Sequence, residues 1–293
     1  MKKRSFQLFL SPFVFQIQTD IELVLENARL MYGERFKERV DDEQFVDYYL
    51  SIVKSSGVRH FYKPQARFFC DSREPFKPLR LNQAFAMLEW GMNWTIASHE
   101  LQYCIVHSGV LEKDGKAILF PAPPGSGKST LTAFLANNGW RLLSDEMAMI
   151  LPQTNQVIPF VRPICLKNQS IQLAKNWFSG AKFSSIARDT HKGDVIHMAP
   201  NSSAFKQNQV PAKIVGVVFP QYRPNAELAI YQLDMADAFM QLAQNTFNFR
   251  VLGNSSFTTL TQLIETIQSF EIHYSDLEEV EAFLREDIIE RSS

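Results

Sequence analysis

The segment Ala117–Gly139 constrains the fold of this chain more than any other. It combines an apolar strand, a turn that contains two glycines, and a helix that starts near Lys128. Gly125 and Gly127 permit backbone angles that other residues resist, so successive N–H groups can face one anion. The helix N-terminus adds unpaired N–H groups and a partial positive charge. The segment therefore predicts a phosphate-binding loop within an α/β domain.

The residue types at the end of this turn predict a nucleoside triphosphate bound with Mg²⁺. We expect Lys128 to reach the β- and γ-phosphates and the Ser129 hydroxyl to ligate the metal. Ala122 stands where the full motif has its first glycine, and alanine fits there if its φ stays negative. The expected nucleotide-binding residues are Pro124, Gly125, Ser126, Gly127, Lys128, Ser129 and Thr130.

Two acidic residues follow the next expected strand. Trp140–Ser144 is predicted to be that strand, and it closes on Asp145 and Glu146. Mg²⁺ prefers hard oxygen ligands and keeps water, so an acid at a strand end beside a phosphate loop suits it. We expect Asp145 to help hold the metal. A second acid can polarise water in a hydrolase or take the proton of a substrate hydroxyl in a kinase.

The chain is expected to divide into a small α+β region over residues 1–97 and a larger α/β domain over 98–293. In the first region, Phe13, Phe15 and Ile17 alternate with other residues as in a half-buried strand. A helix with one apolar stripe is predicted from Asn82 to about His99. Further strands are expected at Arg59–Tyr62 and Arg67–Cys70.

Beyond about residue 100, apolar strands alternate with helical segments, which is typical of an α/β sheet covered on both faces. Two capping boxes, Thr19 with Glu22 and Ser275 with Glu278, predict helix starts. The expected strands of this region are Tyr103–Val106, Ala117–Phe120, Arg141–Leu143 and Ile214–Phe219.

Charge and composition argue against several classes of partner. The formal net charge of −1 gives no broad basic field, so no nucleic-acid partner is expected. No apolar run approaches the ~20 residues needed to span a bilayer, so membrane insertion is not expected. Cys70, Cys104 and Cys165 are far apart in the sequence, which fits buried thiols in the cytoplasm rather than zinc ligands or a disulfide framework.

His107 before the phosphate loop and the two acids after it resemble the arrangement of the HPr kinase/phosphorylase family. The chain is most similar to the HPr-kinase-related kinases, in particular the branch called HprK-related kinase A. The resemblance covers nearly the whole chain. It is carried by Ser11–Phe13, Arg29–Tyr32, Pro123–Thr130, Leu142–Glu146, Arg162–Pro163, Leu166–Asn168, Thr190–Gly193, Phe219–Tyr222 and Asn245–Asn248.

This resemblance implies a P-loop kinase domain of the HPr kinase/phosphoenolpyruvate carboxykinase-like type. By resemblance, Lys128 and Ser129 bind ATP and Mg²⁺, Asp145 helps hold the metal, and His107 lies beside the catalytic acid. The HPr kinases carry an aspartate where this chain has Glu146, so Glu146 would be the proton acceptor. The expected activity is transfer of the γ-phosphoryl group to a hydroxyl, that of Ser or Thr in a protein or peptide. HPr itself is not the expected substrate, because the signature segment of the HPr kinases is not intact.

Two basic residues are candidates for the substrate side of this site. Lys192 lies in a polar loop, Thr190–Asp194, where the resembling kinases keep a basic substrate-side loop. Arg162 precedes Pro163 and is either a phosphate contact or part of a solvated edge. The expected partners are a nucleotide and a protein or peptide substrate, and a homo-oligomer stays open. Two other functions also stay open: an ATP-binding regulatory module of a biosynthetic or export system, and a P-loop ATP hydrolase.

Overall fold

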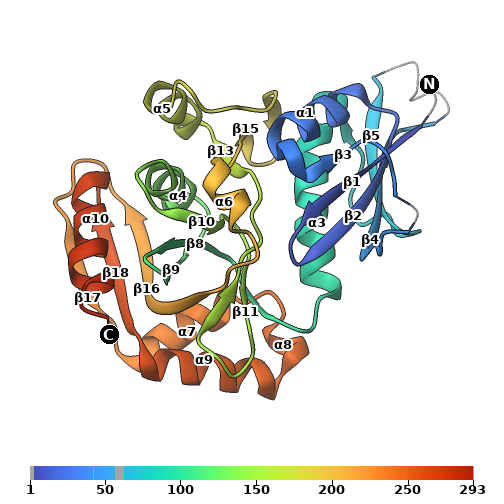
Figure 1. The fold of residues 1–293 in the computed structure, drawn as a ribbon. Helices are drawn as coiled ribbons and strands as arrows, with labels where there is room; N and C mark the ends of the chain where they lie inside the picture. The colour runs from blue at the N-terminus through green and yellow to red at the C-terminus, as the bar shows by residue number, and fades with distance from the viewer. Residues whose placement is uncertain (1–2, 42, 57–62, 293) are drawn as a thin grey trace. The chain divides into compact units, whose positions relative to one another are not determined.

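The computed structural model describes residues 3–41, 43–56 and 63–292, which form a mixed α/β protein with three sheets (Figure 1). The strand expected at Arg59–Tyr62 lies outside the described residues. The contacts divide the chain into two compact units. Unit 1 comprises Met1–Ser98 and Arg162–Pro200, and unit 2 comprises His99–Val161 and Asn201–Ser293.

Unit 1 contains a six-stranded sheet with the order β3-β1-β2-β4-β5-β6. Strands β1 and β2 pair antiparallel, whereas β2 and β4 are parallel. In β2 the alternate residues Phe13, Phe15 and Ile17 are buried, as the sequence predicts. The elements are β1 Arg4–Leu10, β2 Phe13–Thr19, α1 Glu22–Tyr32, η1 Gly33–Arg35, β3 Phe36–Lys37, β4 Tyr48–Lys54, β5 Gln65–Cys70, β6 Leu79–Arg80, η2 Leu81–Gln83 and α3 Ala84–His99.

Helix α3 explains why Arg162–Pro200 belongs to unit 1. One side of the helix packs on the six-stranded sheet of the same unit. A Cβ atom built on Gly91 would lie only 2.2 Å from the ring of Phe68 in β5. Ala86 and Trp90 instead pack against a second, three-stranded sheet with the order β13-β15-β14. Because α3 is covered from both sides, it is buried beyond the single stripe expected from the sequence. The elements of this part are β13 Ile164–Lys167, α5 Gln169–Trp177, β14 Ala187–Thr190 and β15 Gly193–Met198.

Unit 2 is built on a nine-stranded sheet, with a main path of β10-β8-β9-β16-β12-β11-β7. Strand β18 pairs with β16, and β17 pairs with β18. Strands β9, β16 and β18 are mutually parallel, and the remaining pairs are antiparallel. The strands are β7 Cys104–Val106, β8 Ser108–Lys113, β9 Lys116–Pro121, β10 Arg141–Ser144, β11 Ala148–Ile150, β12 Gln156–Ile158, β16 Ala212–Tyr222, β17 Ala229–Gln232 and β18 Gln268–Tyr274.

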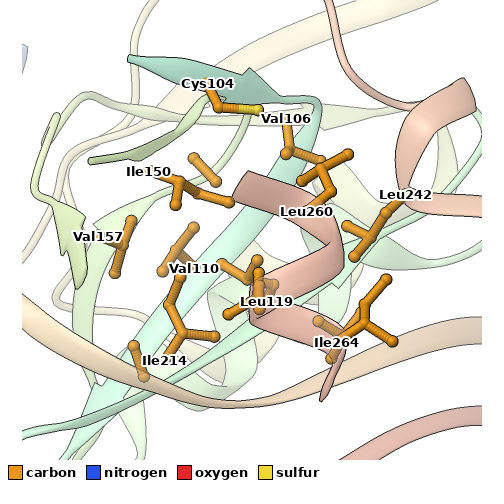
Figure 2. Packing of buried hydrophobic residues seen from close by; sticks show 14 of the residues in the cluster. Cys104, Val106, Val110, Leu119, Ile150, Val157, Ile214, Leu242, Leu260 and Ile264 are labelled. Atoms are coloured by element: carbon orange, nitrogen blue, oxygen red, sulfur yellow. The ribbon is translucent and has the colours of Figure 1, made fainter. Parts of the chain in front are cut away.

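Helices cover both faces of this sheet. Val110 and Leu119 lie in one cluster with Leu260 of α9 and Leu242 of α7 (Figure 2). The neighbouring Gly109 approaches α4 instead, since successive residues of a strand point to opposite faces. Helices α7 and α9 therefore lie on one face and α4 on the other. The helices are α4 Lys128–Asn137, α6 Ser202–Lys206, α7 Met235–Gln244, α8 Phe249–Leu252, α9 Asn254–Thr266, α10 Leu277–Phe283 and a terminal π-helical turn Leu284–Ile289.

The four strands expected in this part of the chain all form, and β8 is a further strand outside those expectations. Neither capping box forms as expected. The hydroxyl of Thr19 accepts from the Ile21 N–H, one residue before the helix, and Asp276 takes the capping position expected of Ser275.

All three cysteines are free and buried, and burial raises the pKa of the Cys104 thiol to about 12. Within the described ranges, no helix combines the length and apolar character that a bilayer span requires.

Candidate functional site

The turn between β9 and α4 has the backbone form that its glycines allow. Gly125 and Gly127 have φ values of 92° and 87°, whereas Ala122 does not adopt a positive φ. Gly127 caps α4, and its oxygen accepts the first helical hydrogen bond, from the Leu131 N–H at 3.0 Å. The loop therefore leads directly into the N-terminus of α4, where backbone N–H groups are available to an anion.

Lys128 and Ser129 both contact Asp145. Lys128 Nζ donates to the main-chain oxygen of Asp145 at 2.5 Å, and Ser129 Oγ donates to Asp145 Oδ2 at 3.2 Å. Lys128 is only 8% exposed and Asp145 only 3% exposed. A lysine, a hydroxyl and a carboxylate thus meet at the end of a glycine-rich turn, although they come from two separate segments of the chain.

The order of the strands brings these segments together. Strand β8 lies between β9 and β10 and is antiparallel to both, so β9 and β10 run in the same direction. Their carboxyl ends consequently meet at one edge of the sheet (Figure 1). The glycine-rich turn follows β9 at that edge, and Asp145 follows β10. Ligands of α/β sheets bind at such carboxyl ends.

His107 and Glu146 are neighbours through the main chain. The Ser108 N–H donates to the Glu146 oxygen at 3.3 Å, and both His107 and Glu146 are half-buried. The His107 N–H donates to the Asn245 oxygen at 2.6 Å, and its ring lies 5.4 Å from the Phe247 ring. The segment Asn245–Asn248 therefore contacts both the main chain and the ring of His107.

Arg162 lies in unit 1, in a buried ion pair. Its Nη2 donates to Glu89 Oε2 at 3.0 Å, and its Nη1 donates to Asn93 Oδ1 at 2.6 Å. Tyr32 also donates to Glu89, and the pKa of Tyr32 is raised well above its ordinary value, first by burial and then by the Glu89 charge. The solvated-edge interpretation of Arg162 is wrong, because the side chain is buried.

Lys192 also belongs to unit 1, in the turn between β14 and β15. Its ammonium lies 5.4 Å from the centroid of the Trp90 ring, within the range of a cation–π contact. His191 packs edge-on against the same ring, and its pKa is lowered by burial, by Lys192 and by Lys167. The loop thus places the positively charged ammonium of Lys192 against the ring of Trp90.

The hydroxyl and the carboxylate beside the glycine-rich turn would suit Mg²⁺ bound together with a polyphosphate. Among the residues that the structure describes, no group of three or more His, Cys, Asp or Glu side chains has the arrangement of a metal site. Ser129 and Asp145 supply one hydroxyl and one carboxylate, which suits an ion that takes its other oxygens from phosphate and water. Ser126 Oγ is buried in the loop and makes no hydrogen bond to any described residue, which leaves a donor for a ligand.

No protein-family model matches this chain, and a search of the curated proteins found no match either.

Sequence reasoning did not foresee the contribution of two tyrosines to this site. Tyr222 and Tyr274 end the parallel strands β16 and β18 and lie against Gly127. In the sequence, Tyr222 stands out only as the end of the segment Phe219–Tyr222 that carries the family resemblance, and nothing local to Tyr274 marks it. Their common position at strand ends becomes visible only when the strand order is known.

Proposed function

We propose that this chain is an ATP- and Mg²⁺-dependent kinase that transfers the γ-phosphoryl group to the hydroxyl of Ser or Thr in a protein or peptide. The observation that carries the proposal is the meeting of Lys128 and Ser129 on Asp145, directly after a turn whose two glycines have positive φ. The resemblance to the HPr-kinase-related kinases favours a protein hydroxyl over water as the acceptor.

Each residue has a role that its chemistry supports. The loop amides and Lys128 would bind the β- and γ-phosphates, and in doing so Lys128 would exchange its bond to the Asp145 oxygen for bonds to phosphate. Ser129 and Asp145 would hold Mg²⁺, which neutralises phosphate charge when bound. His107 is proposed to lie beside the catalytic acid.

The proposed transfer is a single displacement. The acceptor oxygen forms a bond to the γ-phosphorus while the bond from that phosphorus to the bridging oxygen breaks, and ADP leaves. The proton of the acceptor hydroxyl passes to the carboxylate of Glu146. Preorganised positive charge and amide dipoles at the loop stabilise the charge on the transferring group.

Labelling with γ-labelled ATP tests the proposal. The chain is incubated with Mg²⁺ and a lysate of the source cell, in parallel with Lys128→Ala and with Lys206→Ala, which removes an exposed lysine of α6. We expect a labelled protein with the parent and Lys206→Ala that is missing with Lys128→Ala. The same label with Lys128→Ala would refute the assignment of the phosphate loop.

The fate of the label also separates the two alternative functions. Label released only as inorganic phosphate, in a manner that depends on Lys128, would identify a hydrolase. ATP binding without any consumption would identify a regulatory nucleotide-binding module. Either outcome would contradict the kinase proposal while keeping the phosphate loop.

A further inference from the structure

Two tyrosines end the parallel strands that lie beside the phosphate loop. Tyr222 and Tyr274 are the last residues of β16 and β18, and they face each other in the register of that pair. Their rings pack edge to face with centroids 5.9 Å apart. Tyr274 is 1% exposed, whereas Tyr222 is 49% exposed. The pair therefore has one buried and one half-exposed member at the carboxyl edge of the sheet.

This pair is in direct contact with the phosphate loop. The Tyr222 N–H donates to the Ser126 oxygen at 2.9 Å. A Cβ atom built on Gly127 would lie 2.6 Å from Tyr274 Oη and 2.8 Å from Tyr222 Cβ, which is closer than such atoms approach. The main chain at Ser126–Gly127 thus lies on the two tyrosines. By contrast, nothing lies within 4 Å of the Cβ position of Gly125.

The support that the tyrosines give is rigid. Both residues sit at the ends of strands in the parallel part of the sheet, and each ring has few rotatable bonds. Burial raises the pKa of Tyr274 above its ordinary value, and the nearby Tyr222 adds to this effect.

We propose that Tyr222 and Tyr274 are positioning residues of the phosphate loop. They fix the path of Ser126–Gly127, so the loop amides already converge before a polyphosphate arrives. Such preorganisation reduces the ordering cost of binding. This inference rests on the proposed nucleotide site, but it concerns the loop and not the acceptor or the transfer step.

Two ligands test the inference: ATP and inorganic tripolyphosphate, which lacks the nucleoside. Affinities are measured by calorimetry with Mg²⁺ for the parent, Tyr274→Phe, Tyr222→Ala and the double variant. Tyr231→Ala is the matched control, since Tyr231 is a tyrosine of the same sheet with 50% exposure, on β17. We expect each single variant to bind both ligands about threefold to tenfold more weakly, by the same factor for each ligand. Tyr231→Ala should bind both ligands like the parent.

Alanine at position 222 keeps the Cβ atom and the main-chain N–H that contact the loop, so Tyr222→Ala acts by removing the ring that packs on Tyr274. The double variant should therefore lose less than the product of the two single effects, because the Tyr222 ring acts on the loop through Tyr274. A loss for ATP with unchanged tripolyphosphate affinity would overturn the proposal, since Tyr222 would then contact the nucleoside. Unchanged affinity for both ligands in every variant would overturn it as well.

Amide hydrogen exchange of residues 125–130 in the ligand-free chain gives a readout that does not need nucleotide binding. We expect faster exchange of these amides in Tyr274→Phe and Tyr222→Ala, with parent rates elsewhere in β16 and β18. Parent rates at the loop in both variants would refute the positioning role. If the parent chain binds neither ligand, the proposed function fails, and the exchange experiment still decides the positioning role.

Discussion

Lys128 Nζ lies 2.5 Å from the main-chain oxygen of Asp145 and donates a hydrogen bond to it. The next residue along the chain, Ser129, donates to the carboxylate of the same aspartate. One acidic residue therefore accepts from both side chains that a phosphate loop uses for phosphate and for Mg²⁺. This arrangement separates the roles of the two Asp145 groups, because the main-chain oxygen holds the lysine and the carboxylate faces the hydroxyl.

We expect Asp145→Asn to weaken nucleotide binding only when Mg²⁺ is present. Asparagine keeps the shape and the acceptor for Ser129 but removes the charge that attracts the metal. With Mg²⁺ the ATP affinity should fall about tenfold or more, as for the loss of one charged metal ligand. Without Mg²⁺ it should be unchanged or higher, because a buried negative charge beside the phosphates is gone.

Titration calorimetry with and without Mg²⁺ checks this expectation. Asp114→Asn is the control, since Asp114 lies in the β8–β9 turn of the same unit at a φ of 55°, which asparagine tolerates. An equal loss of affinity in both conditions would show that Asp145 supports the loop and does not serve the metal.

Gly127→Ala should damage the site more than Gly125→Ala. Both residues have positive φ, so alanine costs about 1–2 kcal/mol of backbone strain at either position. Only at Gly127 would the new Cβ also collide with Tyr274 and Tyr222. We therefore expect a larger loss of ATP affinity for Gly127→Ala, measured by calorimetry.

Gly139→Ala is the matched control for this pair. Gly139 has a φ of 87° after the end of α4, and nothing lies within 4 Å of its Cβ position. The variant should lose stability in urea unfolding by a similar amount to Gly125→Ala while its ATP affinity is unchanged. Equal ATP affinities for Gly125→Ala and Gly127→Ala would contradict the contact between the loop and the tyrosines.

Arg162→Met should destabilise the chain, because Glu89 would keep a buried charge without its cation. Breaking a buried pair in this way costs about 3–5 kcal/mol. Adding Glu89→Leu should recover part of this loss, since both charges are then gone, although Tyr32 loses its acceptor. Urea unfolding measures all three chains.

The exposed pair of Arg80 with Asp189 provides the comparison for this experiment. Arg80→Met should change the stability by less than about 1 kcal/mol. Loss of phosphoryl transfer in Arg162→Met with unchanged stability would instead support a phosphate contact of Arg162.

The strand, glycine-rich turn and helix of Ala117–Gly139, and the place of the two acids after the next strand, could be predicted from the sequence because each lies within a short segment. Strand, glycines, lysine and hydroxyl occupy Ala117–Thr130, and local backbone requirements fix their order. The expected strand Arg141–Leu143 forms for the same reason, as an apolar run before the acids. Strand β8 does have a local signal, because it joins β9 through the two-residue turn Asp114-Gly115, which is typical of a hairpin. What could not be read is that β8 also pairs with β10, because pairing between distant segments leaves no local pattern.

Competing partners explain other differences from the expectations. Helix α1 begins at Glu22 with Ile21 at the capping position, so Glu22 is the first helical residue, and its carboxylate pairs with Arg4 instead of completing a capping box with Thr19. Ser275 donates its hydroxyl to the Ala226 oxygen, which leaves the cap of α10 to Asp276. The second buried side of α3 depends on Arg162–Pro200, a segment far away in the sequence. In each case a tertiary contact outweighs a valid local preference.

Glu146→Gln is the variant that separates binding from transfer. Glu146 is half-buried, and its main-chain oxygen accepts from the Ser108 N–H beside His107, so the amide variant keeps the local backbone contacts. Glutamine has nearly the same size but cannot take a proton from an acceptor hydroxyl. We expect the ATP affinity to stay within about twofold of the parent, while the rate of transfer falls about 100-fold to 10,000-fold, the usual contribution of a general base. Calorimetry and single-turnover transfer of labelled phosphate measure the two quantities. Transfer at the parent rate would mean that another group accepts the proton, and a parallel loss of ATP affinity would assign Glu146 to the metal together with Asp145.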